Sequence, residues 1–420
     1  MHLSSRRRKS VVVSVLTSLA IGFGIPGIAT SAPDDHGASL DHFYDTSSLV
    51  PGPPGAVLRS QPLVAAGGAG AGQRLIYSTT DVHGAPIPVS GTMLEPRVGW
   101  GGPGPQPLAV IGPGTQGQGD QCAPSRIFDT GFQHTGTSTH INYEGIFAST
   151  FLAQGFRVFF TDYVGLGTPG THTYANRAES GHAILDGARA AATPDQPVLL
   201  WGHSQGGAAV ASAAELGPGY APELNLVAGY ASSPPADLLA VQEHIDGTGL
   251  VAAIGYTING FLARYPELRE PLGSRLNDHG RAVLADVATE CLLDSRGKYG
   301  GHSTSEWTTD GRRLDEVIRD VPVARTVADE QRIGRRVPSI PVMVTGARHD
   351  DFIPYGQTVA LVRDWCAQGG TAVLNTNELP AVNQGSGNNH LAPSAVDYPV
   401  GLGFIRDRLA GIPVRGACNV

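Results

Sequence analysis

Short apolar runs of strand length alternate with helical patterns along most of this chain, and this alternation limits the folds open to it. The strand-like runs and the helical patterns between them occupy residues 74–80, 87–94, 108–112, 146–155 (helical), 156–162, 180–191 (helical), 198–202, 206–216 (helical) and 224–232. Because neighbouring parallel strands need a crossover connection, usually a helix, the alternation predicts an α/β fold. We expect a mainly parallel sheet with helices on both faces.

The alternation stops after residue 232 and resumes near residue 337. The intervening segment, 233–336, contains mostly helical patterns and no clear strand. The later patterns occupy residues 339–347 (strand), 358–368 (helix), 371–376 (strand) and 393–409 (helix). We therefore expect a helical cap, 233–336, inserted between two parts of the sheet domain, 72–232 and 337–420. Residues 32–71 are rich in Pro, Gly and Asp and are expected to form an extended arm.

The first 31 residues have the layout of a secretory signal peptide. Four basic residues, Arg6 to Lys9, precede an apolar run, and small residues follow it at 29–32. Pro26 interrupts the run, so a permanent transmembrane anchor is not expected. The sequence therefore predicts removal of residues 1–31 and a secreted, extracellular protein. Association with the cell wall is an alternative to free release.

The composition is that of an acidic globular protein. Hydrophobic residues make up 41% of the 420 residues and charged residues only 16%, with a net charge of −8. Loss of the four basic residues in the leader would bring the net charge to −12. An acidic surface does not attract nucleic acid, so we expect no such partner. No cluster of metal-ligating residues is evident, and we expect neither metal nor cofactor.

Four cysteines in an exported chain suggest two disulfides. Three pairings of Cys122, Cys291, Cys366 and Cys418 are possible. We favour Cys122 with Cys291 and Cys366 with Cys418, because the last two lie in the same C-terminal region. Free buried thiols are the alternative.

The stretch LLWGHSQGGAA, residues 199–209, places one serine between two glycines. Its motif is Gly202-His203-Ser204-Gln205-Gly206, with a strand pattern before it and a helical pattern after it. At such a strand-to-helix turn, a serine hydroxyl projects from the carboxyl edge of the sheet, and small neighbours keep the turn free of clashes. We interpret Ser204 as a nucleophile. The alternative is a glycine-rich turn with a capping serine.

A nucleophilic serine needs a histidine base, which in this fold class follows the acid in the chain. Five histidines follow Ser204, and three of them lie in the expected cap. His349 precedes the strongest acid candidate. His390, in the loop NQGSGNNHLAPS before the terminal helix, is the histidine that satisfies the order, and we predict that it is the base.

The orienting acid is expected just after the strand at 339–347. Asp350 and Asp351 both stand there, and Asp350 is our choice, with Asp351 in reserve and Glu378 a distant third. We expect the unused neighbour, Asp351, to be solvated or to pair with Arg348.

An oxyanion hole requires two donors near the nucleophile. The residue after the serine, Gln205, would supply one backbone N–H at the start of a helix. The second donor is expected in the loop GPGTQGQGDQCAPS, 112–125, where we choose Gln116. Its neighbours Thr115 and Gly117 remain alternatives.

The cap contains one helical pattern with an apolar face. In GLVAAIGYTINGFLARY, residues 249–265, the side chains of Ile254, Ile258 and Phe261 share a face. That face would line an acyl channel or act as a lid, and ordinary cap core is the alternative. Tyr163 would border the same substrate pocket.

Several motifs resemble those of the secretory lipase family of the α/β-hydrolase superfamily, the group that includes Candida antarctica lipase A. The matching stretches, in chain order, are PGPPGAVLRSQPL, GTQGQGDQCAPS, FTDYVGLGTPGTHTYANR, GHAILDGARAA, WGHSQGGAA, YAPELNLVAGYASSPPADL, HDDFIPYGQ and NNHLAPS. They cover nearly all of the chain after the leader. DQCAPS and YAPELNLV are the most distinctive.

The resemblance implies an α/β-hydrolase core with a helical cap and hydrolysis of carboxylic esters, including acylglycerols at a lipid–water interface. It also implies Ser204 as nucleophile, Asp350 as orienting acid and His390 as base. The family cysteine in DQCAPS pairs with one in the cap, which supports Cys122 with Cys291. The residue before the serine is His203 here, where other members often carry Tyr.

We therefore expect a triacylglycerol lipase that works by two-step acyl transfer through an acyl-enzyme. A short-chain carboxylesterase is the alternative within this interpretation. A serine peptidase on the same fold and a binding protein without activity are two rivals from other classes. The oligomeric state is not indicated by the sequence.

Overall fold

The computed structural model describes residues 35–136 and 138–420, so the predicted leader at 1–31 lies outside the described residues. Nine strands form one sheet in the order β1-β2-β3-β7-β4-β8-β9-β10-β11. The strands from β7 to β11 in that order run parallel, whereas β1, β2, β3 and β7 pair antiparallel. Their bounds are β1 Val57–Val64, β2 Gly70–Thr80, β3 Pro86–Pro96, β4 Leu108–Gly112, β7 Arg157–Thr161, β8 Val198–His203, β9 Leu226–Ser232, β10 Val342–Ala347 and β11 Ala372–Asn377.

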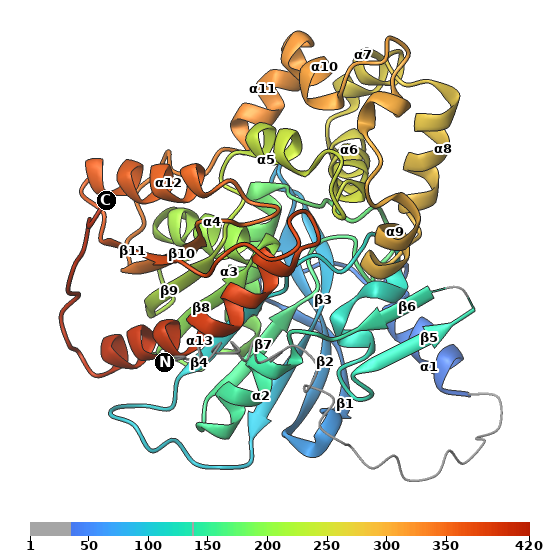
Figure 1. The fold of residues 1–420 in the computed structure, drawn as a ribbon. Helices are drawn as coiled ribbons and strands as arrows, with labels where there is room; N and C mark the ends of the chain where they lie inside the picture. The colour runs from blue at the N-terminus through green and yellow to red at the C-terminus, as the bar shows by residue number, and fades with distance from the viewer. Residues whose placement is uncertain (1–34, 137) are drawn as a thin grey trace, which may run out of the picture. The chain divides into compact units, whose positions relative to one another are not determined.

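Helices cover both faces of this sheet, as the alternation predicts (Figure 1). Alternate residues of a strand point to opposite faces. Val110 of β4 accordingly packs with α3, α4 and α12, and Ile111 packs with α2 and α13. These helices are α2 (Gly145–Ala153), α3 (Arg177–Ala191), α4 (Gln205–Tyr220), α12 (Tyr355–Ala367) and α13 (Asn388–Leu409).

The segment between β9 and β10 folds into helices, which Figure 1 draws in yellow and orange at one end of the sheet. They share a hydrophobic core of their own, in which Tyr256 and Trp307 are fully buried. Phe352 and Ile353, which follow β10, join that core and connect it to the sheet. The helices are α5 (Leu238–Ile245), α6 (Ala252–Arg264), α7 (Arg269–Gly273), α8 (Asp278–Val287), α9 (Leu292–Tyr299), α10 (Leu314–Asp320) and α11 (Pro322–Glu330).

Two regions differ from the sequence expectation. The arm expected at 32–71 contains helix α1 (Asp35–Tyr44) and the edge strand β1, which pairs with β2. The Pro and Gly residues that suggest an irregular arm flank this strand, and a single unpaired edge tolerates them. A second, two-stranded sheet of β5 (Phe132–Thr135) and β6 (Ser138–Ile141) was not expected either.

Candidate active site

Ser204 lies between β8 and α4 in a backbone conformation that L-residues rarely adopt, with φ of 59° and ψ of −122°. Its N–H donates to Ser232 O (2.8 Å) at the end of the neighbouring strand. A Cβ at Gly206 would lie 1.9 Å from Gly112 O, and one at Gly202 would lie 2.2 Å from Gly206 O. The two glycines therefore allow the tight turn that exposes Ser204 at the carboxyl edge of the sheet.

Asp350 and His390 are in direct contact beside this turn. Nδ1 of His390 lies 2.9 Å from both carboxylate oxygens of Asp350. The carboxylate also accepts hydrogen bonds from the N–H groups of Phe352 and Ile353 (both 2.9 Å) and from Ser233 Oγ (2.8 Å). Burial raises the pKa of Asp350, but the charge and hydrogen bond of His390 and the backbone donors outweigh it, so the pKa lies below its ordinary value.

His390 lies in the first turn of α13, which begins at Asn388, and not in the preceding loop that the sequence suggests. The helical pattern is interrupted by Pro393 and Pro399, which makes the start of the helix hard to locate from sequence. Nε2 of His390 is buried and has no hydrogen-bond partner among the described residues. His390 and Ser204 line the same cavity.

Asp351 does not pair with Arg348, contrary to the sequence expectation. Its carboxylate accepts hydrogen bonds from Gly385 N (2.7 Å), Asn389 N (3.0 Å) and Asn389 Nδ2 (2.9 Å). Arg348 pairs instead with the third acid candidate, Glu378 (2.8 Å), at the exposed surface. The two adjacent aspartates thus have different contacts. Asp350 binds the His390 ring, and Asp351 binds the backbone of the segment that carries His390.

The loop after β4, residues 113–122, lies next to the serine because Gly112 touches Gly206. Gln205 is the first residue of α4, and a helix leaves its first N–H groups without an intrahelical partner. Its side chain contacts Nε2 of His172 (3.2 Å), and burial lowers the pKa of His172 to about 4, so this ring is a neutral acceptor.

The side chain of Gln116 is occupied by other contacts of the loop. Its Nε2 donates to Gly114 O (3.2 Å) and Glu144 Oε2 (3.4 Å), and its Oε1 lies 3.1 Å from Nε2 of His140. Gln116 lines the cavity at Ser204, as does Thr115. A contribution of this loop to an oxyanion hole would therefore come from backbone N–H groups.

Glu144 is a buried carboxyl group directly below this loop. Its Oε2 accepts a hydrogen bond from Gly114 N (2.5 Å), while Oε1 is buried without a partner among the described residues. Burial raises the pKa of Glu144 to about 8, against the opposing effect of the Gly114 hydrogen bond. The group is therefore protonated and neutral at pH 7.

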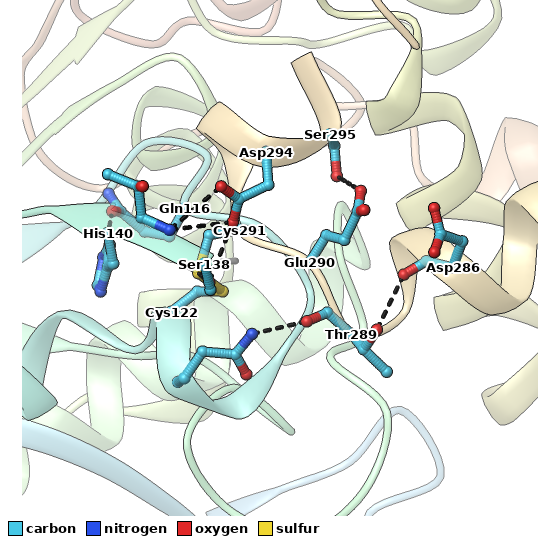
Figure 2. Close-up of a disulfide and its surroundings, with 12 residues drawn as sticks. Gln116, Cys122, Ser138, His140, Asp286, Thr289, Glu290, Cys291, Asp294 and Ser295 are labelled. Carbon is cyan, nitrogen blue, oxygen red and sulfur yellow. Dashed lines mark hydrogen bonds between the residues drawn. A yellow bond between two sulfur atoms is a disulfide. The ribbon is translucent and has the colours of Figure 1, made fainter. Parts of the chain in front are cut away.

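The same loop is fixed to the cap by a disulfide between Cys122 and Cys291, whose Cα atoms are 5.4 Å apart (Figure 2). Leu292 N donates to Gln116 O (2.8 Å), and Ser138 Oγ donates to Asp294 Oδ2 (3.0 Å). The start of α9 is thus bound to the loop by the disulfide and the hydrogen bond of Leu292, and to β6 by the hydrogen bond of Ser138.

The second disulfide joins Cys366 and Cys418, with Cα atoms 5.6 Å apart. Both pairings favoured from the sequence are confirmed, and no described cysteine is free.

His203 packs against the catalytic candidate His390, with ring centroids 4.5 Å apart. Its Nδ1 shares a hydrogen bond of 2.9 Å with Ser232 Oγ. Burial lowers the pKa of His203 well below its ordinary value, and the nearby His390 lowers it further. The ring is therefore neutral and does not compete with His390 for the charge of Asp350.

Two cavities meet at Ser204. One lies beneath the cap and is hereafter the inner cavity; the other is the outer cavity. The inner cavity is lined by Ser204, Gln205, Leu238, Val241, Ile245, Leu250, Ala253, Thr257, Arg177, Ser180 and Gln331, among others. The outer cavity is lined by Thr115, Gln116, His140, Tyr143, His203, Ser204, Leu292, Leu293, Arg296, Phe352, His390 and Leu391, among others.

None of the four residues proposed for substrate binding lines either cavity. Ile254, Ile258 and Phe261 are buried in the cap core, so the ordinary packing alternative describes them. Helix α6 does border the inner cavity, but through Ala253 and Thr257. Tyr163 lies below the loop after β4 and donates from its hydroxyl group to Pro113 O (2.9 Å).

Sequence reasoning missed several residues around the serine. They are His172 and Glu144, which hold neighbouring side chains and backbone, Asp351, and the α9 residues that line the outer cavity. The sequence predicts Asp351 only as the reserve acid. Its hydrogen bonds depend on the position of Asn389, which sequence spacing does not give. No local motif marks the others.

Within residues 35–136 and 138–420, no helix is long and apolar enough to cross a membrane. The same ranges contain no group of three or more His, Cys, Asp or Glu side chains placed to hold a metal ion.

Solved structures share this fold. Candida antarctica lipase A aligns with a TM-score of 0.78 and 22% identity over 93% of this chain and 90% of its own. A rice cell wall degrading esterase from Xanthomonas oryzae aligns with a TM-score of 0.68 and 20% identity over 86% of this chain and 99% of its own. At these identities the likeness shows the α/β-hydrolase fold.

Sequence relatives cover most of the chain. A protein of Mycobacterium tuberculosis described as a probable inactive lipase is 27% identical over 86% of this chain and 80% of its own length. A secreted triacylglycerol lipase of Malassezia furfur is 26% identical over 74% of this chain and 63% of its own. The family model for secretory lipases matches residues 131–416. The chain therefore belongs to the secretory lipase family.

Proposed function

We propose that this protein is a secreted triacylglycerol lipase in which Ser204, His390 and Asp350 form the catalytic triad. The observation that carries the proposal is the contact between Asp350 and Nδ1 of His390 beside a serine held at a positive φ. A carboxylate on Nδ1 fixes the tautomer in which Nε2 is the base. That nitrogen has no hydrogen-bond partner among the described residues, and His390 and Ser204 line the same cavity.

Hydrolysis would proceed through an acyl-enzyme. His390 Nε2 takes the proton of Ser204 as Oγ attacks the ester carbonyl, and the proton then passes to the leaving alcohol as the C–O bond breaks. Water deprotonated by His390 attacks the acyl group, and the acid leaves as Ser204 regains its proton. Asp350, whose pKa is lowered, keeps its charge and stabilises the imidazolium at each step.

The oxyanion of both tetrahedral intermediates would bind the N–H of Gln205 and a backbone N–H of the loop at 115–117. Loss of one such donor typically costs 10²- to 10³-fold in kcat. The neutral state of Glu144 suits this role, because a charged carboxylate below the loop would repel the oxyanion.

The inner cavity is the better site for the acyl chain. Leu238, Val241, Ile245 and Leu250 give it apolar walls, and it begins at Ser204. Burial of each methylene group there would contribute about 0.8 kcal/mol. The outer cavity, next to His390, would then receive the alcohol, which needs the proton from that side.

The relative from Mycobacterium tuberculosis is described as a probable inactive lipase, so family membership alone does not establish activity. The proposal rests on this chain's own serine, histidine and aspartate.

Initial rates on p-nitrophenyl esters from acetate to palmitate, with purified protein lacking the leader, would test it. We expect turnover that persists at long acyl chains and falls on the order of 10⁶-fold in Ser204→Ala. Loss of turnover beyond about butyrate would instead indicate a short-chain carboxylesterase. Absence of ester turnover in a folded protein would refute the triad assignment and leave peptide substrates to be tried.

A further inference from the structure

The outer cavity has a positive charge at its wall and no negative one. Arg296 of α9 lines it, and none of the other described residues that line it is acidic. Its histidines His140 and His203 are neutral, because burial lowers the pKa of His140 to about 4 and that of His203 well below its ordinary value. The cavity that would receive the alcohol is therefore electropositive.

The guanidinium of Arg296 reaches from α9 to the segment that precedes His390. Its Nη2 donates to Ser386 O. A Cβ at Gly387 would lie 3.4 Å from Nη1 of Arg296 and 2.9 Å from the Phe352 ring, so Nη1 lies beside that ring. Phe352 lines the outer cavity and packs against His390, with ring centroids 5.2 Å apart. The charge is thus placed on the side of the cavity that holds the proposed base.

Two nitrogens of this guanidinium have no hydrogen-bond partner among the described residues. The bond to Ser386 O uses Nη2, whereas Nε and Nη1 make none. Neither of these two is buried without a partner, so each keeps accessible surface. An acceptor that enters the outer cavity beside Phe352 can therefore bind Nη1.

The acids near Arg296 are bound to other groups. Glu290 pairs with Lys298 (3.0 Å), and Asp294 accepts a hydrogen bond from the backbone of β6 (3.1 Å). Asp351 binds N–H groups of the segment that carries the proposed base. None of these three carboxylates forms an ion pair with Arg296, so an anion in the cavity would meet a positive charge that is not yet paired.

The chemistry of the donor favours phosphate as that anion. A guanidinium group binds phosphate and carboxylate oxygens more strongly than neutral oxygens, because the hydrogen bonds are charge-assisted. In esters of glycerol, phosphate is the anionic group that stands on the alcohol part, and the alcohol part is the one assigned to this cavity.

We propose that the outer cavity accepts glycerol esters whose alcohol part carries a phosphate group, which Arg296 binds. The inference rests on the proposed function, because it takes the outer cavity as the alcohol site. The bond that breaks is the same acyl C–O bond: glycerol phosphate leaves with the proton from His390, and water then releases the fatty acid from Ser204. Arg296 is a specificity residue and takes no part in these bond changes.

The test compares kcat/KM for 1-decanoylglycerol and 1-decanoylglycerol 3-phosphate, both below the concentration at which micelles form, in the wild-type protein and in Arg296→Gln. Glutamine can still donate to Ser386 O but has no charge. The ratio of the phosphorylated to the plain ester should fall about tenfold or more in the variant, because a charged hydrogen bond is lost. A purely structural role of Arg296 would lower both rates alike and leave the ratio unchanged.

The matched control is Lys298→Gln, because Lys298 is on the same helix, pairs with Asp286 and Glu290 and does not line the cavity. It removes the same charge, and its ratio should equal that of the wild type. Arg296→Lys keeps the charge and should retain most of the ratio. An equal ratio in the wild type and Arg296→Gln, or an equal fall in Lys298→Gln, would overturn the inference.

A second measurement needs no variant, in case thermal melting shows that Arg296→Gln does not fold. Glycerol 3-phosphate should inhibit wild-type hydrolysis of p-nitrophenyl decanoate competitively, whereas glycerol at the same concentration and ionic strength should not. Absence of inhibition by glycerol 3-phosphate would also overturn the inference. Failure of the proposed function would appear differently, as no turnover of any of these esters.

Discussion

The two disulfides bind very different parts of the molecule. Cys122 and Cys291 are both buried, 169 residues apart, and join the loop beside Ser204 to the start of α9. Cys366 and Cys418 are 52 residues apart and join α12 to the C-terminal tail. That tail pairs with the outer strand β11 through Cys418 N to Ala372 O (2.7 Å). One bond therefore supports the site, and the other covers an edge of the sheet.

Comparing the two disulfides separates their effect on the stability of the protein from their effect on the geometry of the site. Loop-closure entropy gives at most about 5 kcal/mol for the longer loop and about 4 kcal/mol for the shorter one. The two disulfides should therefore restrict the unfolded chain to a similar extent. Their expected effects on catalysis differ because of what each bond holds in the folded protein.

The largest effect is expected when Cys122 and Cys291 are both replaced by serine. The unfolding free energy should fall by up to about 5 kcal/mol. In the protein that remains folded, kcat should fall at least tenfold, because the loop proposed to supply an oxyanion donor loses its covalent support. Urea unfolding and kcat on one ester would measure both. An unchanged kcat would mean that hydrogen bonds such as Leu292 N to Gln116 O suffice to hold the loop.

Replacement of Cys366 and Cys418 by serine should cost nearly as much stability, up to about 4 kcal/mol, yet leave kcat within about twofold. The edge of β11 should also become accessible, which hydrogen exchange at Leu374 would report, since Leu374 N donates to the tail residue Asn419 (2.9 Å). A fall in kcat as large as that of the first pair would abolish the contrast.

The segment that carries His390 has no disulfide and depends on Asp351 instead. Asp351→Ala removes its three hydrogen bonds to Gly385 and Asn389, and kcat should fall about tenfold, equivalent to about 1.4 kcal/mol. The control is Glu378→Gln, because Glu378 pairs with Arg348 at the surface. Equal kcat in the two variants would show that α13 positions His390 without help from Asp351.

The smallest effect is expected from the charge of Glu144. This carboxyl group contacts the loop that the Cys122–Cys291 disulfide supports. Since burial raises the pKa of Glu144 to about 8, the group is neutral below that pH and negative above it. Above about pH 8 the wild-type kcat should therefore decline severalfold, as the new charge opposes the oxyanion. Glu144→Gln keeps an acceptor for Gly114 N and cannot ionise, so its kcat should stay level up to pH 9.5. A parallel decline in both proteins would contradict this.

Much of the site can be predicted from sequence because catalytic residues stand at strand ends in a fixed chain order. Ser204 and Asp350 directly follow strands whose apolar runs are unmistakable, and the order rule then leaves one histidine. The cysteine pairs follow from their distribution along the chain. Local patterns of this kind can be recognised without knowledge of the tertiary structure.

The proposed acyl pocket, the inner cavity, could not be predicted in the same way. Helical periodicity shows that Ile254, Ile258 and Phe261 share a face, but not which of two apolar surroundings that face meets. The larger side chains pack into the cap core, and the smaller Ala253 and Thr257 border the cavity.

At Ser204 the backbone conformation lowers stability, while the hydroxyl group is required for the proposed activity. A non-glycine residue at φ of 59° and ψ of −122° costs on the order of 1–3 kcal/mol. Glycine would relieve that cost, so Ser204→Gly should be more stable than Ser204→Ala, although both lack the proposed nucleophile. Selection for the hydroxyl group thus retains, at the centre of the sheet edge, a residue that selection for stability alone would replace.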